Sequence, residues 1–283
     1  MAKMAKNLIN FHLHSTGSDG KMAPEDVINE AVIAGINYIC FTDHYKLPNN
    51  LDIYSQKFYS DEHFEKLLNL SKQEKEKIDI SLGAEFEWYP GYNEWYGQEI
   101  SRRNYDFLIG AVHGLLYNKE ITIGFWDKPE YFDKLVRKLG GKENYVREYF
   151  NQVRLMAKSK LFDCIGHLDI LKYNNTEDKY FSENDNLYVQ EIKNTLDTIA
   201  ESKTCIEINM RGAMKQGEGK QCPSLWILKE ARKRNIPVTI GTDAHTEGQV
   251  GKYLQEAYEL ARQAGYKEIV RFKARKMISM PID

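Results

Sequence analysis

Seven short apolar runs, each carrying a histidine or an acidic residue at or near its end, constrain the fold of this chain more than any other feature. Helical patterns separate the runs, so the chain alternates between strand and helix. Parallel strands joined by helical crossovers are typical of an α/β barrel, and the count favours seven units rather than eight. The runs are Leu8–His14, Tyr38–His44, Ile80–Glu87, Phe107–His113, Cys164–Asp169, Cys205–Asn209 and Val238–His245.

The intervening segments carry helix signals. Pro24, followed by two acidic residues, opens a helix after the first run, and Gly35 stands where that helix should end. The charged segment Asp61–Lys77 predicts an exposed amphipathic helix, and Leu225–Asn235 has the same pattern. The two longest interstrand segments are rich in aromatic residues and glycine near their starts, which favours loops at the mouth of the barrel. They are Trp88–Tyr105 and Gly114–Asp163.

Length and charge are those of one enzyme domain. A barrel of this kind commonly has about the length of this 283-residue chain, so we expect residues 1–283 to form a single domain. The net charge of −2 argues against a stable complex with nucleic acid, although it leaves small nucleotides open as substrates. No apolar stretch approaches a membrane span, and the cysteines stand singly. We therefore expect a cytoplasmic protein with no membrane partner.

The first chemical signal is His12-Leu13-His14. Side chains at positions i and i+2 of a strand point to the same face, so both imidazoles can meet one metal ion inside the barrel. This pair alone is weak evidence for a metal site. Asp19 follows in a polar turn, where an aspartate is equally explained as a turn residue.

Support for a metal site comes from recurrence at the ends of later strands. A single histidine at a strand end is more often a hydrogen-bonded structural residue, but the same coincidence on successive strands favours metal binding. His63 is the exception, since the charged helical pattern around it predicts a solvated helix face. The later candidates are His44, Glu85, His113, His167, Asp243 and His245.

Nitrogen and oxygen donors without sulfur suit zinc, manganese or iron, and these donors exceed what one ion can use. Two or three ions can share a bridging carboxylate, bind a hydroxide and clamp a phosphoryl group. The sequence has no nucleophile elbow, P-loop or dinucleotide-binding glycine motif, which removes common competing mechanisms. The pattern favours metal-dependent hydrolysis without a protein nucleophile.

These motifs resemble the polymerase and histidinol phosphatase (PHP) family. The matching segments are FHLHSTGSDGK, FTDH, LGAEFE, GAVH, IGHLD, IEIN and GTDAH. The resemblance implies a distorted (β/α)7 barrel with three divalent metal ions at the C-terminal mouth of its strands. It assigns His12, His14, Glu85 and Asp243 to a first ion, with Glu85 bridging to a second ion held by His113 and His167. It assigns Asp19, His44 and His245 to the third ion.

Within the family, the stretches FDCIGHLDILKY and IEINMRGAMKQGEGKQCPS resemble the histidinol-phosphate phosphatase branch. The resemblance implies hydrolysis of L-histidinol phosphate to L-histidinol and phosphate in histidine biosynthesis, through a metal-bound hydroxide. A PHP-type phosphatase acting on nucleotides or phosphotyrosine is the alternative. A non-catalytic barrel would have lost ligands that this chain retains, and an amidohydrolase usually has a modified bridging lysine where this chain has Glu85.

A phosphatase also needs cations that orient the phosphate. Arg211 is the strongest candidate because it follows the sixth run by two residues, and Arg154, Lys172 and Lys215 are further candidates. Exposed charge is the plain alternative for Arg154 and Lys215. The branch usually reads Asn-Thr-Ser-Gly after the sixth strand, whereas this chain reads Asn209-Met210-Arg211-Gly212.

Proton transfer is the least readable part of the chemistry. Asp243 can shuttle a proton while it binds an ion, and His245 can serve the leaving group. Glu207 is either a residue that orients a histidine or a buried carboxylate with other partners, and Asp169 either orients substrate or caps the next helix. Four aromatic residues could close over the substrate, although each is more simply explained as cover for the barrel. They are Trp88, Tyr89, Trp95 and Trp126.

Overall fold

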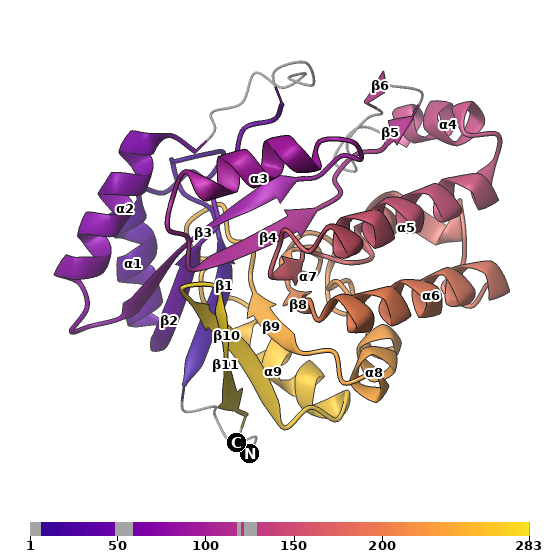
Figure 1. Cartoon of the computed structure of the whole chain (residues 1–283). Helices are drawn as coiled ribbons and strands as arrows, with labels where there is room; N and C mark the ends of the chain where they lie inside the picture. The colour runs from indigo at the N-terminus through magenta and orange to yellow at the C-terminus, as the bar shows by residue number, and fades with distance from the viewer. Residues whose placement is uncertain (1–6, 49–58, 118–119, 122–128, 283) are drawn as a thin grey trace.

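The computed structural model describes residues 7–48, 59–117, 120–121 and 129–282. Within these residues, seven parallel strands form one sheet in the order β1-β2-β3-β4-β7-β8-β9 (Figure 1). Each strand falls within one of the apolar runs or extends its start by one or two residues, so the prediction of seven units is confirmed. The strands are β1 (Leu8–Leu13), β2 (Ile36–Phe41), β3 (Asp79–Glu87), β4 (Phe107–Ala111), β7 (Cys164–Ile165), β8 (Cys205–Asn209) and β9 (Val238–Gly241).

The sheet curls until its first and last strands meet. The amide of His14 donates to Ala244 O at 3.0 Å, and the amide of Asp243 donates to His12 O at 2.8 Å. Leu13 and Ala244 also form a parallel bridge. The strands therefore make a nearly closed barrel, which brings the residues after β9 beside those after β1.

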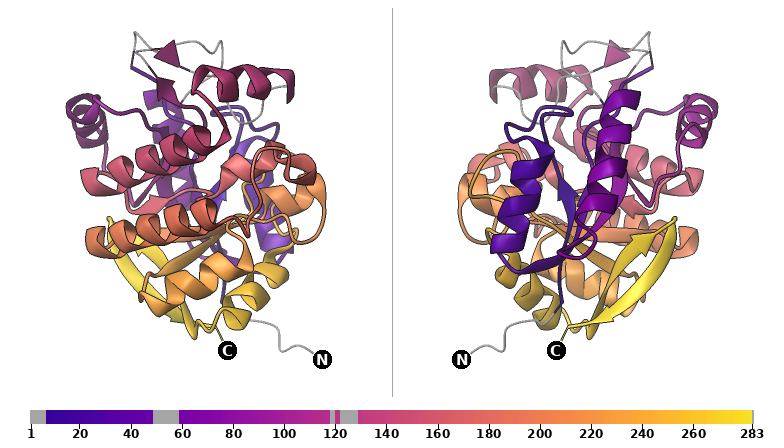
Figure 2. Two further views of the ribbon diagram at one scale, coloured as in Figure 1. Left: turned by 90° about the vertical axis from the view of Figure 1, so that its right-hand side faces the viewer. Right: turned by 90° about the vertical axis from the view of Figure 1, so that its left-hand side faces the viewer.

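Helices surround the barrel on its outside (Figures 1 and 2). Helix α2 shows the expected amphipathic pattern, because Phe64, Leu67 and Leu70 are buried while most of its other residues are solvent-accessible. Helix α1 ends before Gly35, whose φ of 71° suits a residue without a side chain. Within the described residues, no helix has the length and apolar character needed to cross a membrane. The helices of this layer are α1 (Pro24–Ile33), α2 (Asp61–Gln73), α3 (Asn93–Ser101), α5 (Lys142–Ser159), α6 (Asn186–Ser202), α8 (Leu225–Lys233) and α9 (Leu254–Gln263).

Each of the two long segments predicted as mouth loops contains a helix of the outer layer, and for those parts the prediction is wrong. Trp88–Tyr105 contains α3, and Gly114–Asp163 contains α5. The reason is topological, since a parallel strand returns to its neighbour through a crossover that is usually a helix. The remaining elements near the mouth are β5 (Leu116–Tyr117), β6 (Glu120–Ile121), α4 (Pro129–Lys138), α7 (Arg211–Gln216) and two 3-10 helices, η1 (Ile170–Asn174) and η2 (Thr176–Asp178).

A C-terminal hairpin of β10 (Glu268–Lys273) and β11 (Lys276–Pro281) packs at the N-terminal ends of the barrel strands. Ser81 Oγ, near the start of β3, donates to Phe272 O at 3.2 Å. The amide of Ala274 donates at 2.9 Å to Asp106, which directly precedes β4. The hairpin therefore lies at the end of the barrel opposite the histidines that follow the strands.

Candidate metal centre

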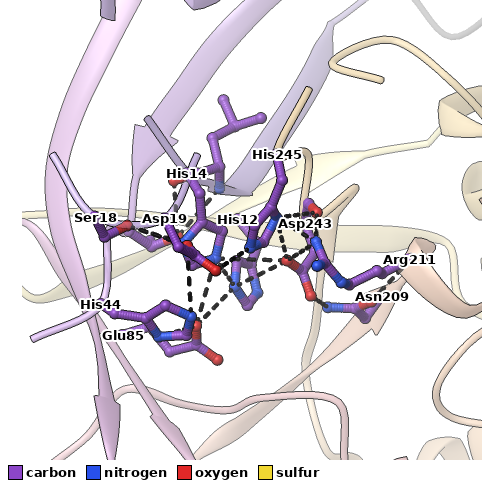
Figure 3. A network of polar contacts seen from close by, with 12 residues as sticks. His12, His14, Ser18, Asp19, His44, Glu85, Asn209, Arg211, Asp243 and His245 are labelled. Carbon is purple, nitrogen blue, oxygen red and sulfur yellow. Dashed lines mark hydrogen bonds and ion pairs between the residues drawn. The ribbon is translucent and has the colours of Figure 1, made fainter. Parts of the chain in front are cut away.

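All nine predicted ligands converge at the C-terminal mouth of the barrel. Figure 3 shows the side chains of His12, His14, Asp19, His44, Glu85, Asp243 and His245 pointing toward one another. They fall into three groups, and within each group the donor atoms lie within 4.8 Å of one another. We name them the Glu85 group, the β1 group and the outer group. The Glu85 group is Glu85, His113 and His167; the β1 group is His12, His14 and Asp243; the outer group is His14, Asp19, His44 and His245.

Glu85 lies at the centre of this arrangement. It stands near the end of β3, and its carboxylate is 1% exposed. Both of its oxygens face imidazoles, as expected for a carboxylate that bridges cations. Oε2 lies 3.3 Å from His12, 3.4 Å from His14 and 3.1 Å from His44, while Oε1 lies 2.9 Å from His167 and 3.4 Å from His113.

Two pairs of histidine nitrogens face each other. His12 Nε2 lies 3.0 Å from His14 Nε2, and His113 Nε2 lies 3.0 Å from His167 Nε2. Two unprotonated ring nitrogens at this distance repel each other unless a proton or a cation stands beside them. Neutral imidazole and carboxylate are the donors that zinc, manganese and iron accept, so the donor set fits divalent cations.

The outer group is assembled largely from loops. Asp19 Oδ2 lies 3.2 Å from His245 Nε2, and Asp19 Oδ1 lies 3.6 Å from His14 Nδ1. Asp19 was the least specific candidate in the sequence, because its turn explains an aspartate equally well. In the structure it is the only carboxylate of the outer group. His14 belongs to two groups, with Nδ1 toward Asp19 and Nε2 toward Asp243 at 3.5 Å.

The charge balance of the centre differs from one histidine to another. Burial opposes charge on His12, but the nearby carboxylates of Glu207, Asp243 and Glu85 outweigh it and raise its pKa. Burial and the neighbouring imidazoles of His245 and His44 lower the pKa of His14. For His113, burial is again outweighed by carboxylates, and its pKa is raised to about 9.

Glu207 orients His12, which decides between the two readings of this residue. It is fully buried on β8, and its Oε2 lies 2.8 Å from His12 Nδ1. Its Oε1 accepts the amide of His167 at 2.6 Å and Asn209 Nδ2 at 2.9 Å. With Nδ1 occupied in this way, His12 directs Nε2 into the metal centre.

Glu87 plays the corresponding part for His113, and sequence reasoning missed it. Its Oε2 lies 2.5 Å from His113 Nδ1, and its Oε1 accepts the amides of His113 at 3.0 Å and Gly114 at 3.1 Å. The signal was available, since Glu87 follows Glu85 by two residues on β3 and therefore points to the same face.

His63 is not on a solvated helix face, and that prediction is wrong. Its Nε2 lies 2.9 Å from Asp43 Oδ2, and its side chain is 10% exposed. The first turn of α2 packs against the polar turn after β1, so a position that looks exposed by helical periodicity alone is covered by another segment.

Arg211 reaches the centre as expected. Its Nη1 lies 3.3 Å from Asp243 Oδ1, donates to Asp243 O at 2.9 Å and contacts His245 Nδ1. Arg154 lies elsewhere, on α5, where Nη1 contacts Glu191 at 2.7 Å and Thr195 at 3.1 Å. Contact between Arg154 and a substrate stays a prediction, while the structure gives it a role between two helices.

Lys172 and Asp169 form a buried pair. Lys172 Nζ lies 2.7 Å from Asp169 Oδ2 and 2.7 Å from Ser224 Oγ, and its side chain is 9% exposed. Asp169 precedes the 3-10 helix η1 but makes no side-chain cap hydrogen bond, so the capping explanation is wrong. Lys215 is exposed on α7.

The aromatic candidates serve mainly as cover. Trp88 and Tyr89 are buried, and Trp95 is partly buried against the core. Trp126 lies outside the described residues.

This chain is similar to known proteins in sequence and in fold. The model of the PHP domain matches residues 10–211. A "Probable histidinol-phosphatase" of Deinococcus radiodurans is 30% identical over 270 residues, which cover 93% of this chain and 94% of the relative. One of Thermotoga maritima is 25% identical over 278 residues, covering 97% and 100%.

A solved structure shares the fold. It is histidinol phosphate phosphatase of Lactococcus lactis, complexed with zinc, L-histidinol and phosphate. It superimposes with a TM-score of 0.76 at 23% identity, covering 96% of this chain and 99% of the other.

Proposed function

Because this chain belongs to the PHP domain family, we propose that it is a metal-dependent phosphomonoesterase that hydrolyses L-histidinol phosphate to L-histidinol and phosphate in histidine biosynthesis. The named activity of the relatives supports the substrate, since the match to the Deinococcus radiodurans protein runs over nearly the whole of both chains. The small phosphorylated substrate is the partner that this activity requires.

The observation that carries the proposal is the surroundings of Glu85. A buried carboxylate faced by five imidazoles within 3.4 Å is an arrangement for gathering cations, not for packing. A buried cluster of this size would be costly if its only purpose were structural. The nine donors therefore support a catalytic centre rather than a relic barrel.

We assign the cations to the residues of the three groups. Zinc, manganese or iron would be held by the Glu85 group, the β1 group and the outer group, with Glu85 shared between them. Divalent ions bound there supply Lewis acidity for the phosphoryl oxygens and lower the pKa of bound water.

The protein's own residues position the substrate around these ions. We assign Arg211 to the phosphate, because its guanidinium already stands at the mouth beside Asp243 and His245. Asp243 belongs to the β1 group and also contacts Arg211. We assign proton transfer to Asp243 and His245. Burial opposes ionisation of Asp243, but Arg211 and His12 outweigh it and lower its pKa, so its carboxylate is charged at neutral pH.

We also propose that residues 1–283 form one domain. The family match ends at residue 211, yet β9 supplies the last strand of the barrel and leads to Asp243 and His245. A fragment that stopped at residue 211 would lack both the closing strand and two ligands.

The proposal is tested by phosphate release from the purified protein loaded separately with manganese and with zinc. Histidinol phosphate is compared with nucleoside monophosphates and with a phosphotyrosine peptide, and His12→Ala is the inactive control. We expect kcat/KM for histidinol phosphate to exceed the others by about 100-fold or more, because buried polar groups that recognise one substrate reject analogues that leave them unpaired.

A preference for a nucleotide or for phosphotyrosine would contradict the proposed substrate but would be consistent with the proposed metal centre. No phosphatase activity on any of these substrates, with metals bound, would overturn the proposal.

A further inference from the structure

We propose that His63 is a positioning residue that holds the turn carrying Asp19 and thereby fixes the outer group for its cation. The inference rests on the proposed function, because it presumes that the outer group binds a cation. Nothing in the chemistry assigned above uses His63, although its ring is 10% exposed and stands against a buried carboxylate.

The first step is the hydrogen bonding of Asp43, which directly precedes the outer ligand His44. Asp43 is fully buried. Its Oδ1 accepts Ser15 N at 2.7 Å and Ser18 Oγ at 2.7 Å, and its Oδ2 accepts Ser15 Oγ at 2.8 Å. These bonds tie the turn between His14 and Asp19 to the end of β2.

His63 completes this set from a third segment. Its Nε2 lies 2.9 Å from Asp43 Oδ2 and 3.4 Å from Ser15 Oγ. The ring also lies flush on Gly17, since a Cβ built on Gly17 would come within 2.1 Å of His63 Nε2. The imidazole therefore both contacts the Asp43 carboxylate and packs on the turn.

The backbone of His63 is itself fixed. Ser60 caps α2 by accepting His63 N at 3.1 Å, and the neighbouring Tyr59 N donates to His44 O at 3.0 Å. The start of α2 is thus attached to the segment that carries His44. His63 connects this rigid helix start to the turn of residues 15–18.

The outer group depends on that connection more than the other groups do. Asp19 is 32% exposed and lies between the turn of residues 15–18 and Lys21, whose amide donates to His245 O at 2.7 Å. Besides facing its histidine partners, Asp19 Oδ1 accepts a hydrogen bond from Ser18 Oγ at 3.4 Å. In the Glu85 group, Glu85 itself lies on β3. His113 and His167 are held by Glu87 and Glu207, so loss of His63 leaves these supports in place.

The test compares His63→Ala with His63→Gln by metal content after dialysis against a weak chelator and by competition titration with zinc. Wild-type protein should retain three zinc ions per chain. His63→Ala should retain two and bind the third about 10- to 100-fold more weakly, the usual cost of removing a group that orients ligands. His63→Gln should recover most of this loss, because its amide N–H can donate to Asp43.

Glu65→Ala is the matched control, since Glu65 is exposed on the same helix. It should bind three ions with unchanged affinity. If His63→Ala does not fold, Ser15→Ala removes one bond between the turn and Asp43 without removing a contact to a ligand, and it should weaken the same single ion.

Full retention of three ions by His63→Ala with wild-type affinity would overturn the inference. Equal weakening of all three ions, together with a lower unfolding temperature, would also overturn it by showing a general structural role. Failure of the wild-type protein to bind zinc would instead reject the proposed function itself, so the two failures are distinguishable.

Discussion

The Glu85 group and the outer group are held in different ways. Glu85 lies near the end of β3, while His113 and His167 follow β4 and β7, and the exposed fractions of these side chains are between 1% and 6%. In the outer group, Asp19 and His44 are 32% and 19% exposed and belong to segments beyond the strands. The barrel strands position the Glu85 group, whereas hydrogen bonds between loop side chains position the outer group. The comparison teaches that the same centre has a part fixed by the fold and a part fixed by side-chain supports.

The largest loss of activity is expected for a substitution of Glu85, which lies on a barrel strand and contacts histidines of both the Glu85 group and the outer group. Glu85→Gln removes the charge that faces five imidazoles. We expect kcat/KM to fall by about 10³-fold or more, which corresponds to several kcal/mol of the transition-state stabilisation that metal ions supply. Phosphate release measures this, with circular dichroism to verify the fold. Near wild-type activity in folded Glu85→Gln would show that the shared carboxylate is unnecessary.

A smaller effect is expected where a strand residue orients a ligand without binding the metal. In Glu207 one carboxylate oxygen faces His12 Nδ1 and the other accepts the amide of His167. Glu207→Gln keeps the size of the side chain but replaces one of these two acceptors by an NH2 group. We expect metal affinity and activity to fall by about 10- to 100-fold. Glu191→Gln is the matched control, because Glu191 is a buried carboxylate that pairs with Arg154 away from the centre. Equal behaviour of the two variants would contradict the assigned role of Glu207.

Protonation of His113 should make metal binding by the Glu85 group depend on pH. The pKa of His113 in the metal-free protein is raised to about 9, above its value in an unfolded chain. Below that pH the ring carries a proton that a cation must displace, so metal affinity should rise by about tenfold per pH unit up to pH 9 and then level off. The same raised pKa stabilises the metal-free fold fully below about pH 6.5, and this stabilisation is lost as the pH rises through 9.

Competition titrations at several pH values measure the pH dependence of metal affinity. In His113→Gln, one fewer proton should be released when the metal binds, so the affinity should rise less steeply with pH. Affinity that stays constant between pH 7 and 9 in the wild-type protein would show that His113 is already neutral.

The smallest effect is expected outside both regions. Arg154→Ala removes an ion pair with Glu191 that joins α5 and α6. We expect the free energy of unfolding to fall by about 1 kcal/mol, because the pair is partly exposed, with activity within about twofold of wild type. Chemical denaturation and phosphate release measure the two quantities. A large loss of kcat/KM with an intact fold would instead place Arg154 against the substrate.

Sequence reasoning located the strands and the strand-end ligands well, for a physical reason. A strand that is buried on both faces must be apolar, so a histidine or glutamate at its end stands out. The (β/α)7 order also forces all seven strand ends to one mouth. The sequence could therefore place His12, Glu85 and His113 together at this mouth.

The supports of these ligands could not be predicted as well. His63 contacts Asp43 across 20 residues and Ser15 across 48, and helical periodicity describes only the faces of its own helix. Arg154 and Lys172 likewise pair with Glu191 and Asp169, while contact of either cation with a substrate stays a prediction. Partners distant in sequence decide these cases, and a single chain does not display them.

The most direct test of the account is a crystal structure of the protein grown with zinc, with anomalous diffraction measured at the zinc absorption edge. The account predicts three zinc peaks at the mouth of the barrel, surrounded by the Glu85 group, the β1 group and the outer group, with Glu85 contacting more than one. Zinc peaks away from these residues, or side chains of His12, Glu85 and His113 directed to separate regions, would contradict it.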